Sequence, residues 1–218
     1  TVGDAATPKQ TATSMQILLL FTILSIAPAI LISVTSFTRL IIVFSFLRQA
    51  MGTQQMPPNQ IMVSLALFLS FFIMSPVITT IDQTAVKPMM AGEITQTEAM
   101  NRGAAPLKEF MLTQTREKDL ALFVQMSRTE RPGTVKDLPM SVVIPSFMIS
   151  ELRTAFQIGF VIYLPFLIID LIVSSVLMSM GMMMIPPVMI SLPFKVLLFV
   201  LVDGWSLICH SMVQSFHL

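Results

Sequence analysis

The chain has 218 residues, of which 54% are hydrophobic and only 11% charged, against roughly 25% charged residues in an ordinary soluble domain. A chain with so few charges cannot cover a water-exposed surface, so it must bury apolar area in lipid or against other protein chains. Its formal net charge of +1 gives no general attraction to nucleic acid, and its single cysteine, Cys209, excludes an internal disulfide and a cysteine-based metal cluster.

A polar N-terminal tail, residues 1–15, precedes a predicted first helical hairpin over residues 16–81. The two arms of this hairpin are the apolar segments 16–37 and 60–81, and a segment of about 20 apolar residues is long enough to cross a hydrocarbon core. Residues 52–59 between the arms are polar, uncharged and rich in turn-forming residues, which predicts the turn of the hairpin.

Prolines interrupt the apolar segments along the whole chain. Each proline removes a backbone donor and clashes with the preceding helical turn, and in lipid the freed carbonyl groups need another partner. We therefore expect bent helices that pack mainly on other subunits, with lipid contact secondary. The prolines concerned are Pro28, Pro76, Pro165, Pro186, Pro187 and Pro193.

The middle of the chain, residues 82–153, carries nine of the thirteen basic and nine of the twelve acidic residues. Balanced charge and helically spaced apolar residues predict short amphipathic helices in water, with a loop at residues 131–133. By contrast, Arg39 and Arg48 flank the first turn with no acid nearby in the sequence. Under the positive-inside rule, that turn faces the cytoplasm and the middle region faces the opposite side of the membrane.

Residues 154–218 form a predicted second helical hairpin, with apolar runs at 154–169 and 171–194 and a methionine-rich turn before Pro186. If the chain turns back near residue 183, Asp170 and Lys195 lie at similar depth on facing arms. A lone charge is costly in apolar surroundings, so we predict an ion pair between these two residues.

Several long motifs closely resemble the FliP family of flagellar export-gate proteins, whose injectisome relatives form the SctR branch. The resemblance extends from about residue 16 to the end of the chain, and Phe37-Thr38-Arg39 and Leu47-Arg48-Gln49-Ala50 favour the flagellar branch. The further motifs that carry it are Gly52-Thr53-Gln54-Gln55, Pro57-Pro58-Asn59-Gln60, Phe72-Ile73-Met74-Ser75-Pro76, Pro145-Ser146-Phe147, Ser150-Glu151-Leu152, Ala155-Phe156-Gln157-Ile158-Gly159-Phe160, Pro193-Phe194-Lys195 and Val202-Asp203-Gly204-Trp205.

The resemblance implies an all-α subunit of a channel through which unfolded flagellar proteins cross the inner membrane as transient cargo. In this family about five copies join a related subunit of the FliR family in a pseudo-hexameric, right-handed spiral, and copies of a small FliQ-family protein wrap the outside. The expected location is the flagellar basal body in the bacterial cell membrane, with much of the complex on the periplasmic side. No cofactor and no nucleic acid are implied.

Met182, Met183 and Met184 are the predicted gasket of that channel. Methionine is flexible and polarizable, so several copies can close an irregular gap and reopen around a variable guest. The pattern alone also fits a turn that merely packs against its neighbours, and the resemblance is what favours a gasket.

Three further residues are candidates for subunit contacts. Phe110 and Phe123 lie on apolar helix faces, where local core packing is the alternative, and the resemblance places Phe123 near the channel mouth. Glu151, in apolar surroundings, is expected to bind an arginine or a backbone terminus of the next subunit, with exposure to solvent as the alternative. Because Glu151 and Arg153 are two residues apart, they point in different directions on a helix and do not pair.

The sequence contains no phosphate-binding loop, no nucleophile signature near its two histidines and no paired acids at metal-binding spacing, so we expect no enzymatic activity. The corresponding injectisome subunit, a small-solute transporter and a scaffold without a pore are the alternatives. A transporter would be expected to show inverted repeats and several intramembrane charges facing a cavity, and the two hairpins share no obvious symmetry.

Overall fold

The computed structural model describes residues 8–53, 55–127, 134–182 and 184–216, and within these ranges it is all-helical, without a strand. This confirms the predicted all-α class. In chain order the elements are α1 (Pro8–Ser33), α2 (Phe37–Met51), α3 (Asn59–Ile81), the π-helical η1 (Asp82–Val86), α4 (Lys87–Met90), α5 (Gln96–Gln114), α6 (Glu117–Met126), the short 3-10 helix η2 (Val135–Asp137), α7 (Met140–Ser179), α8 (Pro187–Leu201) and α9 (Gly204–Gln214).

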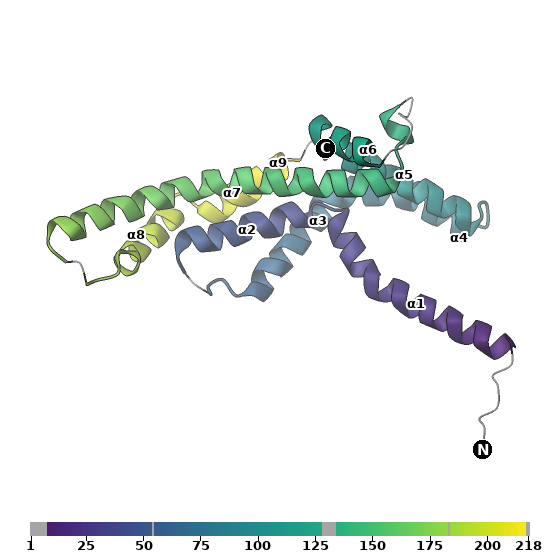
Figure 1. Ribbon diagram of the computed structural model, residues 1–218, viewed down its shortest axis with the longest axis horizontal. Helices are drawn as coiled ribbons and strands as arrows, with labels where there is room; N and C mark the ends of the chain where they lie inside the picture. The colour runs from purple at the N-terminus through teal and green to yellow at the C-terminus, as the bar shows by residue number, and fades with distance from the viewer. Residues whose placement is uncertain (1–7, 54, 128–133, 183, 217–218) are drawn as a thin grey trace, which may run out of the picture.

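Helix α7 runs along almost the whole body of the molecule, and the other helices pack beside it (Figure 1). Helices α2, α5 and α6 pack along its N-terminal half, and α8 folds back along its C-terminal half. Helix α3 packs on α2 and α5. Helix α1 projects away from the body and contacts α2 at its own C-terminal end (Figure 1). With 40 residues and a rise of about 1.5 Å per residue, α7 is about 60 Å long and carries the frame on which both hairpins are placed.

The core lies where α2 packs against α7. Leu40, Val43, Phe44 and Leu47 repeat at the spacing of one helix face and are fully buried, as the amphipathic pattern of α2 requires. On α7, Gly159 lets α2 approach closely, because a β-carbon at this position would lie 2.6 Å from the ring of Phe46. Burial of these side chains fixes α2 along α7 and leaves the outer face of α7 apolar and exposed.

The first hairpin differs from the prediction in one arm. The apolar segment 16–37 is interrupted at residues 34–36, so α1 ends at Ser33 and α2 begins at Phe37. At this break the hydroxyl of Ser36 lies 3.0 Å from that of Ser70 on α3, and both side chains are buried. The expected turn at residues 52–59 lies between α2 and α3, and Gly52 ends α2 with a positive φ of 73°.

The boundary placed between the middle region and the second hairpin, residues 153 and 154, falls inside α7, which begins at Met140. Asp170, which divides the apolar sequence into two runs, also lies inside α7, which continues to Ser179. The charge of Asp170 interrupts the apolar sequence but does not end the helix, because Lys195 neutralises it. The loop predicted at residues 131–133 lies outside the described residues.

Two helical stretches, Asn59–Met90 and Met140–Ser179, are long and apolar enough to cross a membrane. A third is formed if α8 and α9, which meet at a 65° bend, are taken together. At this bend Asp203 adopts a left-handed conformation with φ of 49°, and Gly204 packs directly against the ring of Phe199. Among the described residues, the structure is therefore that of a membrane protein by length and composition of its helices.

Candidate functional site

The methionine-rich turn at residues 180–186 is formed by a glycine stop signal followed by a proline start signal. Gly181, with φ of 75°, donates its N–H to the carbonyl of Met178 at 3.0 Å, and Met182 donates to the carbonyl of Leu177 at 3.0 Å. This pair of bonds is the Schellman arrangement, which satisfies the last carbonyl groups of a helix. Helix α8 then begins with Pro187 at its first position, where the missing N–H costs nothing.

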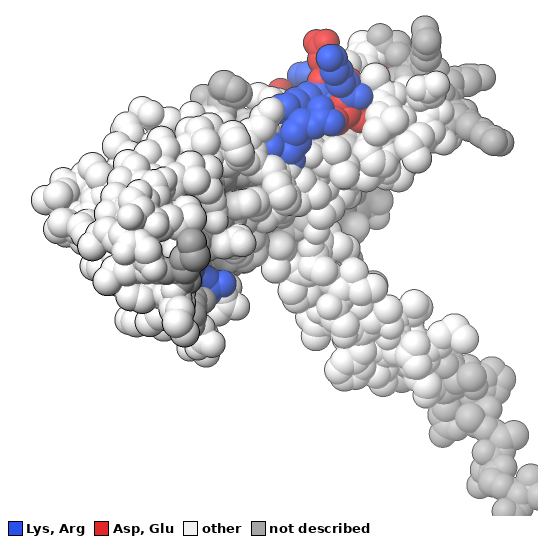
Figure 2. Space-filling model, turned by 60° about the vertical axis from the view of Figure 1, so that its left-hand side comes forward, with Lys and Arg blue, Asp and Glu red and all other residues white. Residues whose placement is uncertain are grey.

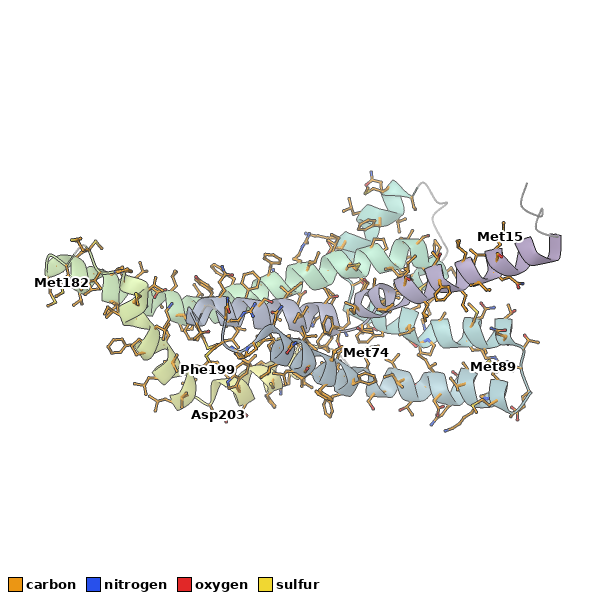
Figure 3. All side chains as sticks on the ribbon, turned by 90° about the horizontal axis from the view of Figure 1, so that it is seen from below. Met15, Met74, Met89, Met182, Phe199 and Asp203 are labelled. Carbon is orange, nitrogen blue, oxygen red and sulfur yellow. The ribbon has the colours of Figure 1, made fainter. Side chains whose placement is uncertain are left out.

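The methionine side chains of this turn point outward at one end of the molecule, where Figure 3 shows Met182. Met184 is 98% exposed and Met182 is 43% exposed. Met183, the third residue of the predicted gasket, lies outside the described residues. Met182 and Met184 therefore present flexible thioether groups to the outside, and the Met184 side chain is almost fully exposed.

A charge cluster joins the two arms below the turn. Lys195 on α8 donates to the Asp170 carboxylate on α7 at 2.6 Å, so the predicted ion pair is present in the structure. Ser191 also donates to Asp170, at 2.6 Å, and the Lys195 ammonium reaches the carbonyl of Ala50 at the end of α2, at 3.0 Å. Lys195 is only 3% exposed. The cluster thus holds α7 and α8 together as a hairpin, here called the methionine hairpin, and ties this hairpin to α2.

A second buried cluster forms around Arg39, which has no acid nearby in the sequence. Nε and Nη2 of Arg39 donate to the two oxygens of Glu151 on α7, the first at 2.8 Å, in a bidentate pair that is almost fully buried. Nη1 donates to the backbone carbonyl of Ser215 at 2.7 Å, and the guanidinium lies 3.8 Å from the ring centre of Phe216. Arg39 thus joins α2, α7 and the segment after α9.

This cluster corrects two expectations. Glu151 does bind an arginine, but one of its own chain and not of the next subunit. Arg39 is not a free charge beside the first turn, so Arg48 alone remains there to support a cytoplasmic orientation by the positive-inside rule. A signal was present in the sequence, since both Arg39 and Glu151 are charges in apolar surroundings and each needs a partner.

The two candidate phenylalanines lie in different surroundings. Phe110 on α5 is buried and packs edge-on against Phe147 and in a stack with Phe216, so the structure places it in the core of its own chain. Phe123 on α6 is half-buried against that core, and part of its ring remains on the surface. Of the two, Phe123 is the one whose surface can meet another subunit.

A third polar cluster, which the sequence analysis missed, fixes α6 on α7. Asp119 in the first turn of α6 is buried, accepts a hydrogen bond from Ser150 at 2.8 Å and pairs with Arg153 at 3.1 Å. Ser150 in turn accepts the backbone N–H of Arg116 at 3.0 Å. Glu151 and Arg153 therefore point to different partners, as their spacing predicts. In the part of the chain that the structure describes, no group of three His, Cys, Asp or Glu side chains could hold a metal ion.

Comparison with known sequences decides the family. The model of the FliP family matches residues 20–212, which is nearly the whole chain. The chain belongs to the FliP family. The flagellar biosynthetic protein FliP of Bacillus subtilis (strain 168) is 55% identical to it over 215 residues, which are 99% of this chain and 97% of the relative.

Two further FliP relatives are similar over most of their length. The flagellar biosynthetic protein FliP of Pectobacterium carotovorum subsp. carotovorum is 54% identical over 204 residues, 94% of this chain and 79% of the relative. That of Aquifex aeolicus (strain VF5) is 50% identical over 205 residues, 93% of this chain and 86% of the relative. The resemblance to the FliP family found in the motifs is thereby confirmed.

Proposed function

We propose that this chain is a core subunit of the flagellar type III protein-export gate, which forms the channel for unfolded flagellar proteins. Membership of the FliP family and the names of its relatives, flagellar biosynthetic proteins, support the flagellar role. The observation that carries the channel role is the methionine turn, whose thioethers are exposed at the tip of an apolar hairpin. The role is one of binding and conduction, without a chemical reaction at the protein.

The exposed apolar surface supports assembly with other chains. Large apolar side chains on the outer faces of α7 and α8 are more than half exposed, and a patch of this size on a single chain must be covered by lipid or protein. We propose that about five copies, with subunits of the FliR and FliQ families, cover most of it. The side chains concerned include Phe160, Ile168, Leu171, Ile172 and Leu197.

In such an assembly the methionine turns of neighbouring copies meet at a central axis and close the passage. An unbranched thioether side chain adapts to irregular gaps, so the closed turns hold back ions and part around an extended polypeptide. The Asp170–Lys195 cluster keeps the two arms together while the turn moves. The assembly resides in the bacterial inner membrane, within the flagellar basal body, with much of it on the periplasmic side and its cargo passing through transiently.

Ion leakage through the assembled complex tests this proposal. The complex, expressed with its FliQ- and FliR-family subunits, is reconstituted in planar bilayers, and the triple substitution M182A/M183A/M184A is expected to raise the basal conductance. The control is M90A/M100A, which removes two exposed methionines, 79% and 70% exposed, from the opposite end of the molecule.

Equal conductance of the triple variant and the control would refute the gasket. The triple variant could also show no conductance in bilayers although it exports a flagellar substrate in cells. That result would refute the placement of these methionines at the constriction. A purified complex with the mass of a single chain would refute assembly altogether and would favour a small-solute transporter, which can be checked by uptake with the protein alone.

A further inference from the structure

An open groove with apolar walls runs along one side of α7 and is bordered by α8 and α9. Its volume is about 830 Å³, which lies within the roughly 300–1,000 Å³ of ligand-binding sites. Two of the lining side chains are polar, Gln157 and Ser211. The Ser211 hydroxyl donates to the carbonyl of Leu207, so Gln157 is the lining side chain that can offer polar atoms to a ligand. The walls suit a hydrocarbon chain and are built from Ile158, Ile162, Phe166, Phe199, Leu207 and Ile208.

One end of the groove carries a positive charge. Gln157 accepts a hydrogen bond from Nη2 of Arg116 at 2.5 Å, and the same nitrogen donates to Thr154 at 3.2 Å. Both partners are neutral, and no carboxylate of the described residues forms an ion pair with the Arg116 guanidinium, which is half-buried. An anion at the end of the groove would form an ion pair with this arginine.

The groove has the depth of one leaflet of a membrane. Between Gln157 and Phe166, which line its wall, α7 rises about 14 Å at about 1.5 Å per residue. This is close to half of a hydrocarbon core of about 30 Å. Figure 2 shows basic and acidic side chains gathered in one patch beside a largely uncharged surface that covers one end of the molecule, as a protein at a membrane interface requires.

We propose that this groove binds an anionic phospholipid, with an acyl chain along α7 and the phosphate at Arg116. An apolar helix of another protein could fill the walls but would leave the guanidinium without a counter-charge. A zwitterionic lipid would fill them too, with a weaker contact at Arg116. The combination of an apolar groove and a cation at its mouth favours the anionic lipid, and the site is separate from the methionine turn and its conduction.

Lipid retention by the intact protein tests the site. The full chain is purified in a mild detergent with either phosphatidylglycerol or phosphatidylcholine, and bound lipids are counted by native mass spectrometry. Arg116→Gln is expected to weaken phosphatidylglycerol binding about tenfold, which corresponds to about 1.4 kcal/mol, and to weaken phosphatidylcholine binding by a smaller factor. Arg116→Lys keeps the charge and most of the binding, while Ile162→Trp fills the groove and lowers the binding of both lipids.

The matched control is Arg102→Gln, an exposed arginine on α5 that pairs with Glu98 at 2.8 Å, for which no change is expected. Equal phosphatidylglycerol binding by Arg116→Gln and the unmodified chain would overturn the proposal, as would a lack of effect of Ile162→Trp. Lipid that is bound by the single chain but expelled on assembly would show that another protein occupies the groove, and would overturn it too.

Should a variant fail to fold, the unmodified protein provides the second test. A phosphatidylglycerol with a photoreactive acyl chain is expected to crosslink to peptides that contain residues 157–166 and 198–208. Crosslinks confined to other surfaces would refute the site. Neither experiment depends on conductance, so failure of the lipid site and failure of the channel proposal are distinguishable.

Discussion

Removal of the Glu151 carboxylate is expected to destabilise the whole fold, because it leaves a charge buried without its counter-charge. In Glu151→Gln, the Arg39 guanidinium, 2% exposed in the native chain, keeps only neutral acceptors, such as the Ser215 carbonyl. Breaking a buried pair by removing one partner costs about 3–5 kcal/mol. Glutamine preserves shape and can still accept one hydrogen bond, so we expect a loss near the lower limit, about 3 kcal/mol in the free energy of unfolding.

A double-mutant cycle separates this loss from simple loss of packing. Arg39→Met with Glu151→Leu replaces both charges with apolar groups of similar size, and such replacements are often neutral or stabilising. The double variant is therefore expected to be more stable than Glu151→Gln and than Arg39→Met or Glu151→Leu alone. The cycle of the last two with the double variant is expected to give an interaction energy of about 2 kcal/mol between the sites. The free energy of unfolding is measured by denaturant titration in mild detergent, followed by circular dichroism.

The exposed pair of Arg102 and Glu98 on α5 serves as the control, because its members are 47% and 48% exposed. Neutralising Glu98 is expected to cost about 0.5 kcal/mol or less. A loss below about 1 kcal/mol for Glu151→Gln, or a double variant no more stable than the single one, would contradict the assignment of a buried intrachain pair.

Two other predictions concern the methionine hairpin. Lys195→Met leaves the Asp170 carboxylate, 24% exposed, with Ser191 as its remaining partner, and should lower the free energy of unfolding by about 2 kcal/mol, whereas Asp170→Asn with Lys195→Met should restore part of it. An undiminished stability of Lys195→Met would contradict the cluster. Gly181→Ala should destabilise by about 1–2 kcal/mol, because alanine is strained at a φ of 75°. Gly103→Ala in α5, where an added β-carbon meets only ordinary contacts at 3.6 Å, should be neutral or stabilising, and equal losses at the two glycines would contradict the role of backbone strain.

The methionine hairpin was predictable because its determinants are local. A glycine, a run of methionines and two prolines specify a turn within eight residues, and the structure shows the corresponding helix end and helix start. The Asp170–Lys195 pair then follows from the turn, because folding the chain back near residue 183 brings both charges to one depth. The two charges are close in space because only one short turn separates the helices that carry them.

The Arg39 cluster was not predictable in the same way, because 112 residues separate its two charges. Each residue shows that it needs a partner, yet nothing in the local sequence says which partner, or that it belongs to the same chain. Asp170 divides the apolar sequence into two runs, yet α7 continues through it. Lys195 neutralises its carboxylate and Ser191 donates a hydrogen bond to it.

The buried charges tie the two ends of α2 to its neighbours, the first end to α7 and the last end to α8. Arg39 in the first turn of α2 binds Glu151 on α7, and the carbonyl of Ala50 in its last turn binds Lys195 on α8. Apolar attraction alone fixes such an arrangement weakly, because the outer faces of α7 and α8 are also apolar and lipid offers them surroundings similar to the core.

Directional hydrogen bonds have only one arrangement in which every buried polar group is satisfied, and the described residues leave no buried side-chain nitrogen or oxygen without a partner. We infer that these two clusters determine the direction of the hairpin relative to α2. The position of the methionine turn therefore depends on charges that lie far from it in the sequence.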